Sequence, residues 1–338
     1  MRVTYLIGNG FDLACGLKTR YVDAYARYCI LPSQNENIEK FKETILKDDY
    51  KNWTDFEMAL PQFGKELNNF EKFSECINDF TLFLEKYLEN EEDKIIPDSH
   101  KDKLPGQMEQ YIYHFYNYCL QSSKEKLKAL VESSIENISF QFITYNYTNT
   151  LEKCLSAVKN RVAKNSKSSY IYQYKEPVHI HSSLGNGIIL GLDNEELYKD
   201  IPCSNIGNLK NLIDKVHINA RYSNITDQAL EMLKQSRIIV IFGWSMGDSD
   251  SFWVENLKKL FSSSGNLQLV YVPYYKEPLN RRLRHELLDR EDEKKEFIKN
   301  KLSIPENSMD RVHIITDPAY MNLKYLVEDS KEKEPATV

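Results

Sequence analysis

Short runs of consecutive apolar residues recur along the chain. Runs of about four to eight residues without alternation are typical of strands that are covered on both faces, as in parallel sheets. We therefore predict strands at 3–7, 140–145, 178–181, 188–192, 238–242, 267–272 and 312–316. Helical spacing at 226–235 and 251–261 separates several of these runs. The alternation of strands and helices predicts an α/β fold with an open, doubly wound and mostly parallel sheet, which is Rossmann-like.

Residues 17–137 carry a different pattern and contain no convincing strand run. Apolar positions three and four residues apart recur at 67–88 and 106–135, which predicts helices. A block of this size is too large for a loop, so we predict a helical insertion over the open edge of a cleft. The Rossmann-like core would then comprise 1–16 and 138–327.

Two smaller regions complete the predicted organisation. The irregular stretch 193–222 is predicted to be a smaller lid. The charged stretch 328–338 is predicted to be a disordered tail, because it has too few apolar residues to join a core.

Composition narrows the class of protein. The formal net charge is −6, which argues against nucleic acid as the main partner. The six cysteines never form a C-x-x-C pair, so neither structural zinc nor a disulfide framework is implied. The strand pattern begins beside Met1 and leaves no room for a signal peptide, and no apolar run approaches the roughly 20 residues that cross a bilayer. We expect a soluble, reduced, cytoplasmic protein that does not act at a membrane.

The first predicted strand stops at Gly8-Asn9-Gly10. Closely spaced glycines allow a sharp turn and a close approach of the backbone to a ligand. A helix predicted over 11–28 would present free N–H groups to a phosphate. The full G-x-G-x-x-G spacing is absent, since position 13 is Leu, so a tight turn without a ligand remains an equal alternative for this stretch alone.

Three further strands are followed by polar groups. Asn146 follows 140–145, His181 ends 178–181, and Gly243-Trp244-Ser245-Met246-Gly247-Asp248 follows 238–242. Because ligands bind at the carboxyl ends of strands in an open α/β sheet, these groups are predicted to converge on one crevice.

Each of these groups also has an ordinary structural interpretation. Asn146 could close a turn by bonding its own backbone. His179 and His181 share one strand face and could chelate a metal, although one structural and one site histidine is the favoured reading. The residues that could instead act as helix N-caps or first-turn residues are Asp12, Ser245, Asp248, Ser249, Asp250 and those at 53–57.

A family resemblance rests on five motifs that occur in the order GNGFDLACGLKTRY, NWTDFE, FITYNYTNTLE, HIH and GWSMGDSD. In this order they resemble the motifs of the AbiH family, whose members are associated with abortive infection, a bacterial defence against phage. The resemblance extends from the first predicted strand to the helix after the last motif. Each motif is short, but the ordered set is specific.

AbiH proteins in turn resemble the sirtuin-like group of NAD-binding proteins. That resemblance implies that Asn146 contacts the nicotinamide ribose, that His181 acts beside it, and that the turn 243–245 lies under the dinucleotide. Gly16 corresponds to a second glycine turn. There are two departures: Ser182 follows the histidine where the group has glycine, and the zinc-binding cysteines of protein deacylases are missing, which argues against deacylation.

The reaction that this resemblance implies is cleavage of the nicotinamide–ribose bond of NAD through an oxocarbenium-like state. Asn146 would hold a ribose hydroxyl or the attacking water. His181, with an unperturbed pKa near 6.5, would accept a proton. Backbone N–H groups near Gly8, Gly10 and Ser245 would bind the pyrophosphate. The residues expected to bind the dinucleotide are Gly8, Asn9, Gly10, Phe11, Asp12, Thr144, Tyr145, Gly243, Ser245, Asp248 and Asp250; no metal, and no cofactor beyond NAD, is expected.

The resemblance thus implies an NAD glycohydrolase that depletes NAD in infected cells. A phage-derived trigger and a homo-oligomer contact are expected to gate it, with the helical block as the element that responds. Two alternatives stay open: a sensor that binds NAD or an ADP-ribose-type nucleotide without turnover, and a metal-dependent nuclease or phosphoryl-transfer toxin that uses Asp12, Asp248 and Asp250.

Overall fold

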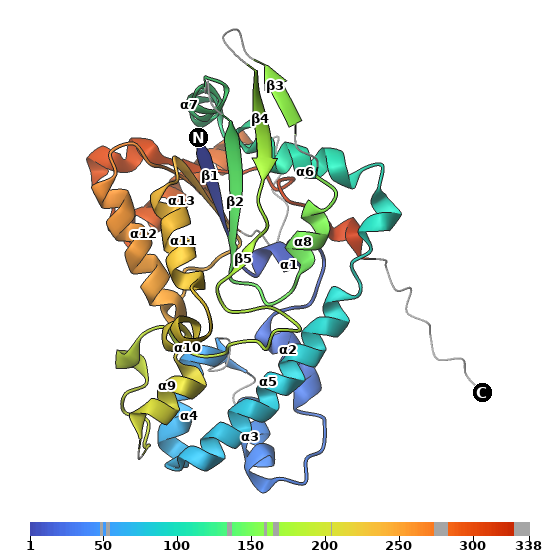
Figure 1. Ribbon diagram of the computed structural model, residues 1–338, viewed down its shortest axis with the longest axis vertical. Helices are drawn as coiled ribbons and strands as arrows, with labels where there is room; N and C mark the ends of the chain where they lie inside the picture. The colour runs from blue at the N-terminus through green and yellow to red at the C-terminus, as the bar shows by residue number, and fades with distance from the viewer. Residues whose placement is uncertain are drawn as a thin grey trace, which may run out of the picture.

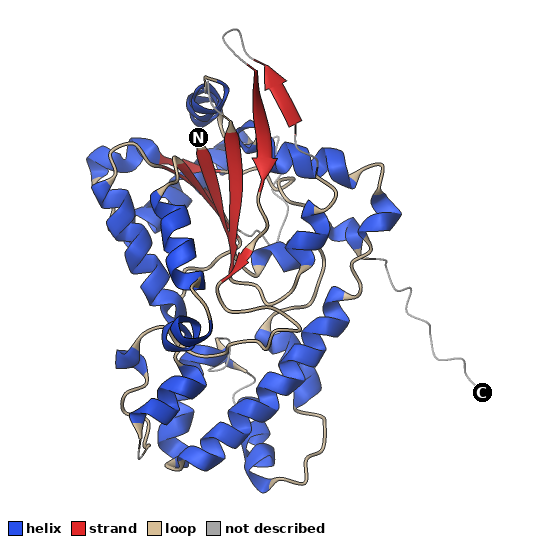
Figure 2. Cartoon of the chain, in the orientation of Figure 1, coloured by secondary structure: helices blue, strands red, loops and turns tan. Residues whose placement is uncertain are grey.

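The computed structural model describes residues 1–47, 50–51, 55–133, 137–158, 161–164, 169–203, 205–273 and 283–327. Within these residues, eight strands form one sheet, in which β5 pairs with β2 and the others follow the order β3-β4-β2-β1-β6-β7-β8. The strands are β1 Arg2–Ile7, β2 Ile138–Thr144, β3 Arg161–Lys164, β4 Ser169–Tyr174, β5 Val178–His179, β6 Ile238–Phe242, β7 Gln268–Val272 and β8 Val312–Ile314. Every pairing is parallel except that of β3 with β4, so the predicted α/β fold with a mostly parallel sheet is confirmed (Figures 1 and 2).

The strand order places a topological switch point beside β1. The chain moves from β1 to β2 and β4 on one side, and then crosses to β6, β7 and β8 on the other side. With the two-residue strand β5 and the antiparallel β3 left aside, the remaining strands numbered in chain order follow 3-2-1-4-5-6, the order of doubly wound dinucleotide-binding sheets. Ile7 is in register with Thr144 on β2 and with Phe242 on β6, so the residues that follow these three strands emerge side by side.

Helices cover both faces of the sheet. On one face, α11 Ile225–Lys234, α12 Ser251–Ser263 and α13 Arg284–Leu302 enclose a cluster that includes Leu6 and Ile241 (Figure 1). On the other face, α1 Gly10–Ala14, α6 Leu104–Tyr113, α7 Gln121–Glu132 and α8 Thr150–Leu155 enclose a cluster that includes Val3 and Tyr5. Because successive strand residues point to opposite faces, β1 contributes to both clusters.

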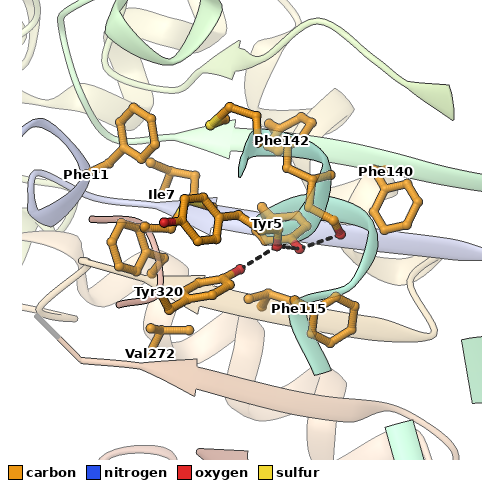
Figure 3. Close-up of a cluster of buried hydrophobic side chains, with 14 of the residues drawn as sticks. Tyr5, Ile7, Phe11, Phe115, Phe140, Phe142, Val272 and Tyr320 are labelled. Carbon is orange, nitrogen blue, oxygen red and sulfur yellow. Dashed lines mark hydrogen bonds between the residues drawn. The ribbon is translucent and has the colours of Figure 1, made fainter. Parts of the chain in front are cut away.

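The second cluster is rich in aromatic side chains (Figure 3). Tyr5 stacks on Phe142 with the ring centroids 5.2 Å apart. Its hydroxyl donates to the carbonyl of Ile112 at 2.9 Å, and the hydroxyl of Tyr320 donates to the carbonyl of Tyr111 at 2.9 Å. These bonds satisfy two phenols in an otherwise apolar core and tie the carbonyl end of α6 to the sheet.

A third cluster lies outside the sheet, beyond the carboxyl ends of the strands (Figure 1). It is built from α2 Tyr21–Tyr28, α3 Glu36–Leu46, α4 Phe56–Leu67 and α5 Phe70–Glu92, together with α9 Ile206–Ile213. Phe56 and Phe80 stack at its centre with the ring centroids 4.4 Å apart. Helix α10 Lys215–Tyr222 follows α9 directly. We call α2–α5 with α9 and α10 the helical unit.

The remaining short elements are 3₁₀ helices, which are η2 Pro97–His100, η3 Phe115–Tyr118, η4 Glu195–Leu197, η5 Asp248–Asp250, η6 Glu306–Arg311 and η7 Lys324–Leu326. None of the helices in the described part of the chain combines the length and the apolar composition that crossing a bilayer requires. The predicted tail at 328–338 lies outside the described residues. The proposed division of the chain into domains stays a prediction, although the predicted helical stretch 67–88 does overlap α5, and the stretch 106–135 overlaps α6 and contains α7.

Two predictions about elements are wrong. The stretch 188–192 is not a strand; its side chains Ile188, Leu190 and Leu192 are buried in the cluster of the helical unit, and this packing accounts for its apolar pattern. The helix expected over 11–28 is instead two helices, α1 and α2. Gly16 interrupts it with φ +93°, a left-handed conformation that ends a helix and that favours glycine.

The hairpin of β3 and β4 was not predicted. It extends the sheet beyond β2 at its edge, and Ile171 of β4 is 39% exposed. In β4 the exposed Ile171 is followed by the buried Tyr172, so the continuous apolar run that revealed the central strands is absent here.

Candidate functional site

A cavity of about 620 Å³ opens at the switch point, between the carboxyl ends of the central strands and the helical unit. The first residues after β1, β2 and β6 line it, as Gly8, Tyr145 and Gly243, and so do α4 and α5. The predicted site residues that line this cavity are Gly8, Asn9, Gly10, Asp12, Tyr145, Asn146, His181, Gly243, Ser245 and Asp250. Parallel strands that end at one edge bring these distant segments together.

Three predicted site residues have other positions. Phe11 is fully buried and packs edge-on against Phe242 in the core of the sheet. Thr144 is also fully buried, and its hydroxyl accepts from the N–H of Asn146 at 3.1 Å. The side chain of Asp248 is 75% exposed and pairs with Lys301. The structure therefore gives the first two a packing or turn-forming position, and the third a surface position.

The glycines bring the turns after β1 and β6 into direct contact. A Cβ on Gly10 would lie 2.4 Å from the Cα of Gly243, and a Cβ on Gly8 would lie 2.5 Å from the Cα of Trp244. The N–H of Gly8 donates to the carbonyl of Phe242, and the N–H of Gly10 donates to the carbonyl of Gly243, both at 2.9 Å. These two N–H groups, which we expected to bind pyrophosphate, are thus engaged by the main chain, and the glycines serve the contact between the turns.

Asn9 also has a structural partner. Its side-chain amide donates to the carbonyl of Thr19 at 3.1 Å, and its side-chain oxygen accepts from the Thr19 hydroxyl. The residue therefore holds the loop between α1 and α2 against the first strand.

A buried carboxyl group orients Asn146. Asp12 accepts from the side-chain amide of Asn146 at 3.0 Å and from the hydroxyl of Thr148 at 2.7 Å. Burial raises the pKa of Asp12 to about 7, against the lowering effect of these two hydrogen bonds. With its NH₂ group held by Asp12, Asn146 keeps its side-chain oxygen without a hydrogen-bond partner among the described residues, although the residue is only 6% exposed.

The two histidines have separate roles. His179 bonds the carbonyl of Asn146 through Nδ1 at 2.9 Å and Glu152 through Nε2 at 2.6 Å, so it supports the turn after β2. Burial alone would lower the pKa of His179, but Glu152 raises it above its usual value. His181 lines the cavity instead and is 5% exposed. One structural and one cavity histidine is the arrangement that the sequence favoured over a metal pair.

His181 lies beside an ionised carboxylate. Its Nε2 is 3.4 Å from Oδ1 of Asp250 without hydrogen-bond alignment. Oδ2 of Asp250 accepts from the indole N–H of Trp244 at 2.9 Å, and Trp244 stacks on Tyr145 with centroids 4.3 Å apart. Burial and the nearby Lys215 lower the pKa of His181, so the imidazole is neutral at pH 7.

Sequence reasoning missed two charged residues of this region. Lys215, at the start of α10, is 2% exposed, and its ammonium lies 2.7 Å from Oε2 of Glu57 and 3.4 Å from Oδ1 of Asp250. Glu57 belongs to the NWTDFE motif, which was interpreted only as a helix start. A motif that resembles the family's was the available signal for Glu57, whereas nothing in the local pattern marks Lys215.

The helix-cap alternatives are resolved by particular bonds. Asp55 caps α4 by accepting from the N–H groups of Glu57 and Met58, which confirms a helix start there; the residues 52–54 lie outside the described part. Asp250 occupies the N-cap position of α12, but its side chain makes no cap bond. The N–H of Phe252 is instead capped by Asp193 at 2.7 Å, from a distant loop. Asp250 is thereby free to contact Lys215 and His181.

The strand order and the cavity define a class: a doubly wound α/β protein with a polar cavity at its topological switch point. Within that class, the chain belongs to the AbiH family of bacteriophage abortive infection, whose family model matches residues 4–271. Membership implies a role in abortive infection, a defence against phage. Among curated proteins, none matches the chain.

Proposed function

We propose that this protein acts in phage defence as an NAD glycohydrolase. The supporting observation is that two buried atoms in one cavity at the switch point, the side-chain oxygen of Asn146 and Nε2 of His181, make no aligned hydrogen bond to any described residue. Buried polar atoms without partners are rare in native proteins and call for an explanation, and a bound ligand is one. Open α/β sheets bind dinucleotides at this position.

The cavity offers groups for each part of the proposed reaction. Asn146, oriented by Asp12, would accept a hydrogen bond from a ribose hydroxyl or from the attacking water. Neutral His181 would take up the proton of that water as it adds to the anomeric carbon, while nicotinamide leaves with the electrons of the glycosidic bond. Since the N–H groups of Gly8 and Gly10 are engaged, Ser245 and Lys294, which line the same cavity, are the groups proposed to bind the pyrophosphate.

The test is incubation of the purified protein with NAD while free nicotinamide is followed by chromatography. We expect release by the wild type once lysate from phage-infected cells is added as the trigger, and a loss of about 10²–10⁴-fold in both Asn146→Ala and His181→Ala under the same conditions. His285→Ala is the matched control, because His285 is exposed on α13 and does not line the cavity. Circular dichroism of each variant establishes that it is folded.

Two results would contradict this proposal. Release that persists in His181→Ala would remove His181 from the mechanism. NAD that binds tightly and is recovered intact, also after addition of lysate from phage-infected cells as the trigger, would favour the nucleotide sensor. Such gating is part of the proposal, because an enzyme that freely depleted NAD would kill an uninfected host.

A further inference from the structure

A fully buried ammonium group lies behind the cavity wall. Lys215 of α10 contacts Glu57 of α4 and Asp250 of η5, so one charge joins three segments that are far apart in the sequence. Burial alone would lower the pKa of Lys215, but the two carboxylates raise it well above its usual value. The group is therefore a cation at every physiological pH.

Both carboxylates are fixed by further bonds. Oε1 of Glu57 accepts from the N–H of Gly191 at 3.1 Å, while Oε2 accepts from Lys215. Burial raises the pKa of Asp250, but Lys215 and then His181 lower it more, so the net effect is a pKa well below the usual range. Asp250 is thus an anion, and its Oδ1 lies 3.4 Å both from the ammonium and from Nε2 of His181.

We propose that Lys215 is a positioning residue for His181: it holds Asp250 as the anion beside the imidazole and keeps that imidazole neutral, while Glu57 limits the strength of its charge. The catalytic part of this inference rests on the proposed function, in which His181 accepts a proton. The electrostatic part concerns His181 alone and can be measured without NAD.

The charged and titratable groups that face His181 come from every element packed around it. They are Lys215 on α10, Asp250 in η5, Tyr145 and Tyr147 after β2, and Glu57 on α4 beyond the ammonium. The tyrosines are neutral at pH 7, because burial raises the pKa of each far above that value. The sign of each charge therefore predicts whether its removal raises or lowers the pKa of His181.

The experiment measures the pKa of His181 by NMR of the ¹³C-labelled imidazole, with the resonance assigned by its loss in His181→Gln. Lys215→Met removes the cation and leaves Asp250, so the pKa of His181 should rise. Glu57→Gln removes an anion and leaves the cation, so the pKa should fall further. A change of packing alone would not move the pKa of His181 in opposite directions when Lys215 and Glu57 are replaced.

The control is Lys199→Met, which removes a lysine whose side chain is 48% exposed and which pairs with Glu196 at the surface; no shift of His181 is expected. If Lys215→Met does not fold, the double variant Glu57→Gln/Lys215→Met replaces it, because it leaves no unpaired charge at position 57, and the same rise is expected. No shift, or shifts of one sign in both single variants, would overturn the proposal.

Activity supplies a second readout. In Lys215→Met, nicotinamide release at pH 7 should fall at least about tenfold and recover at higher pH, because a more basic His181 must first lose its proton. A uniform loss at all pH values would indicate damage to the fold and would overturn the positioning role.

The two proposals can fail independently. If the pKa of His181 shifts as expected but no protein releases nicotinamide, the proposed function fails and the electrostatic role of Lys215 stands. If the wild type releases nicotinamide and the pKa of His181 does not shift in the variants, the electrostatic role of Lys215 fails and the proposed function stands.

Discussion

At the scale of single residues, the cavity is controlled by buried carboxyl groups with different charge states. Burial raises the pKa of Asp12 to about 7 and also raises that of Glu57, against the lowering effect of Lys215, whereas Lys215 and His181 hold the pKa of Asp250 low against the effect of burial. Asp12 and Asp250 differ because of their partners: within the described part of the chain, the hydrogen-bond donors to Asp12 are neutral, whereas Asp250 lies beside the ammonium of Lys215. Groups in one site whose pKa values are driven apart are characteristic of acid–base chemistry.

Asp12 predicts a pH dependence of stability. Its pKa is about 7 in the folded protein and about 3.9 when unfolded, so the folded state holds a proton that the unfolded state has lost between these values. The contribution of Asp12 to the free energy of unfolding therefore falls as the pH rises from about 4 to 7 and is constant above. Asp12→Asn should gain stability relative to the wild type between pH 5 and pH 8, as measured by urea denaturation at both values. A difference between the two proteins that does not change with pH would contradict this assignment.

At the scale of elements, the site depends on two turns that touch. The turn from β1 into α1 and the turn after β6 approach so closely that neither Gly10 nor Gly243 has room for a side chain. The glycines therefore determine where the strands end relative to one another, and hence where Asp12 and Ser245 enter the cavity.

Gly10→Ala should lower the free energy of unfolding by about 1–3 kcal/mol, because the added methyl group would overlap the main chain of Gly243. Gly106→Ala is the matched control. Gly106 lies in α6 with nothing within 4 Å of an added Cβ, so this change should stabilise the helix by about 0.5–1 kcal/mol. Urea denaturation compares the two, and equal effects would show that the close approach of the turns does not limit stability.

At the scale of the whole molecule, the helical unit has its own apolar core and meets the sheet largely through polar contacts around the cavity. Lys215 of α10 lies 3.4 Å from Asp250, which follows β6, and Glu92 of α5 accepts from the N–H of Asn149 at 2.7 Å and pairs with Lys153 at 3.0 Å. Charged groups of this kind depend on precise docking, because a buried charge left without its partner is costly. Docking of the helical unit and completion of the site are thus coupled.

This coupling predicts a local effect of Lys215→Met on hydrogen exchange. Amide protection should fall in α4 and α10 by more than in β1 and β6, because the change leaves buried carboxylates unpaired where the helical unit docks. Lys199→Met, at a surface ion pair, should leave protection unchanged. Mass spectrometry after exchange distinguishes the regions, and a uniform loss across the sheet would contradict the coupling.

The parts of the fold that could be predicted are those with a local cause. The central strands could be predicted from their apolar runs, and the predicted strand 238–242 coincides with β6. The stretch 188–192 carries a similar run but packs into the helical unit, because burial alone does not distinguish a strand from a covered loop. The hairpin of β3 and β4 could not be predicted in this way, because β4 has exposed and buried residues next to each other and so carries no continuous apolar run.

The sequence by itself determined the sheet, its glycine turns and the polar residues that follow its strands, because these follow from short-range patterns and from the rule that parallel strands end together. Only the tertiary structure decided which of those residues share the cavity. It placed Phe11, Thr144 and Asp248 elsewhere, and it brought Lys215 into contact with both Glu57 and Asp250. The physical reason is that a charged pair is made by docking between segments more than 150 residues apart, and no local pattern records it.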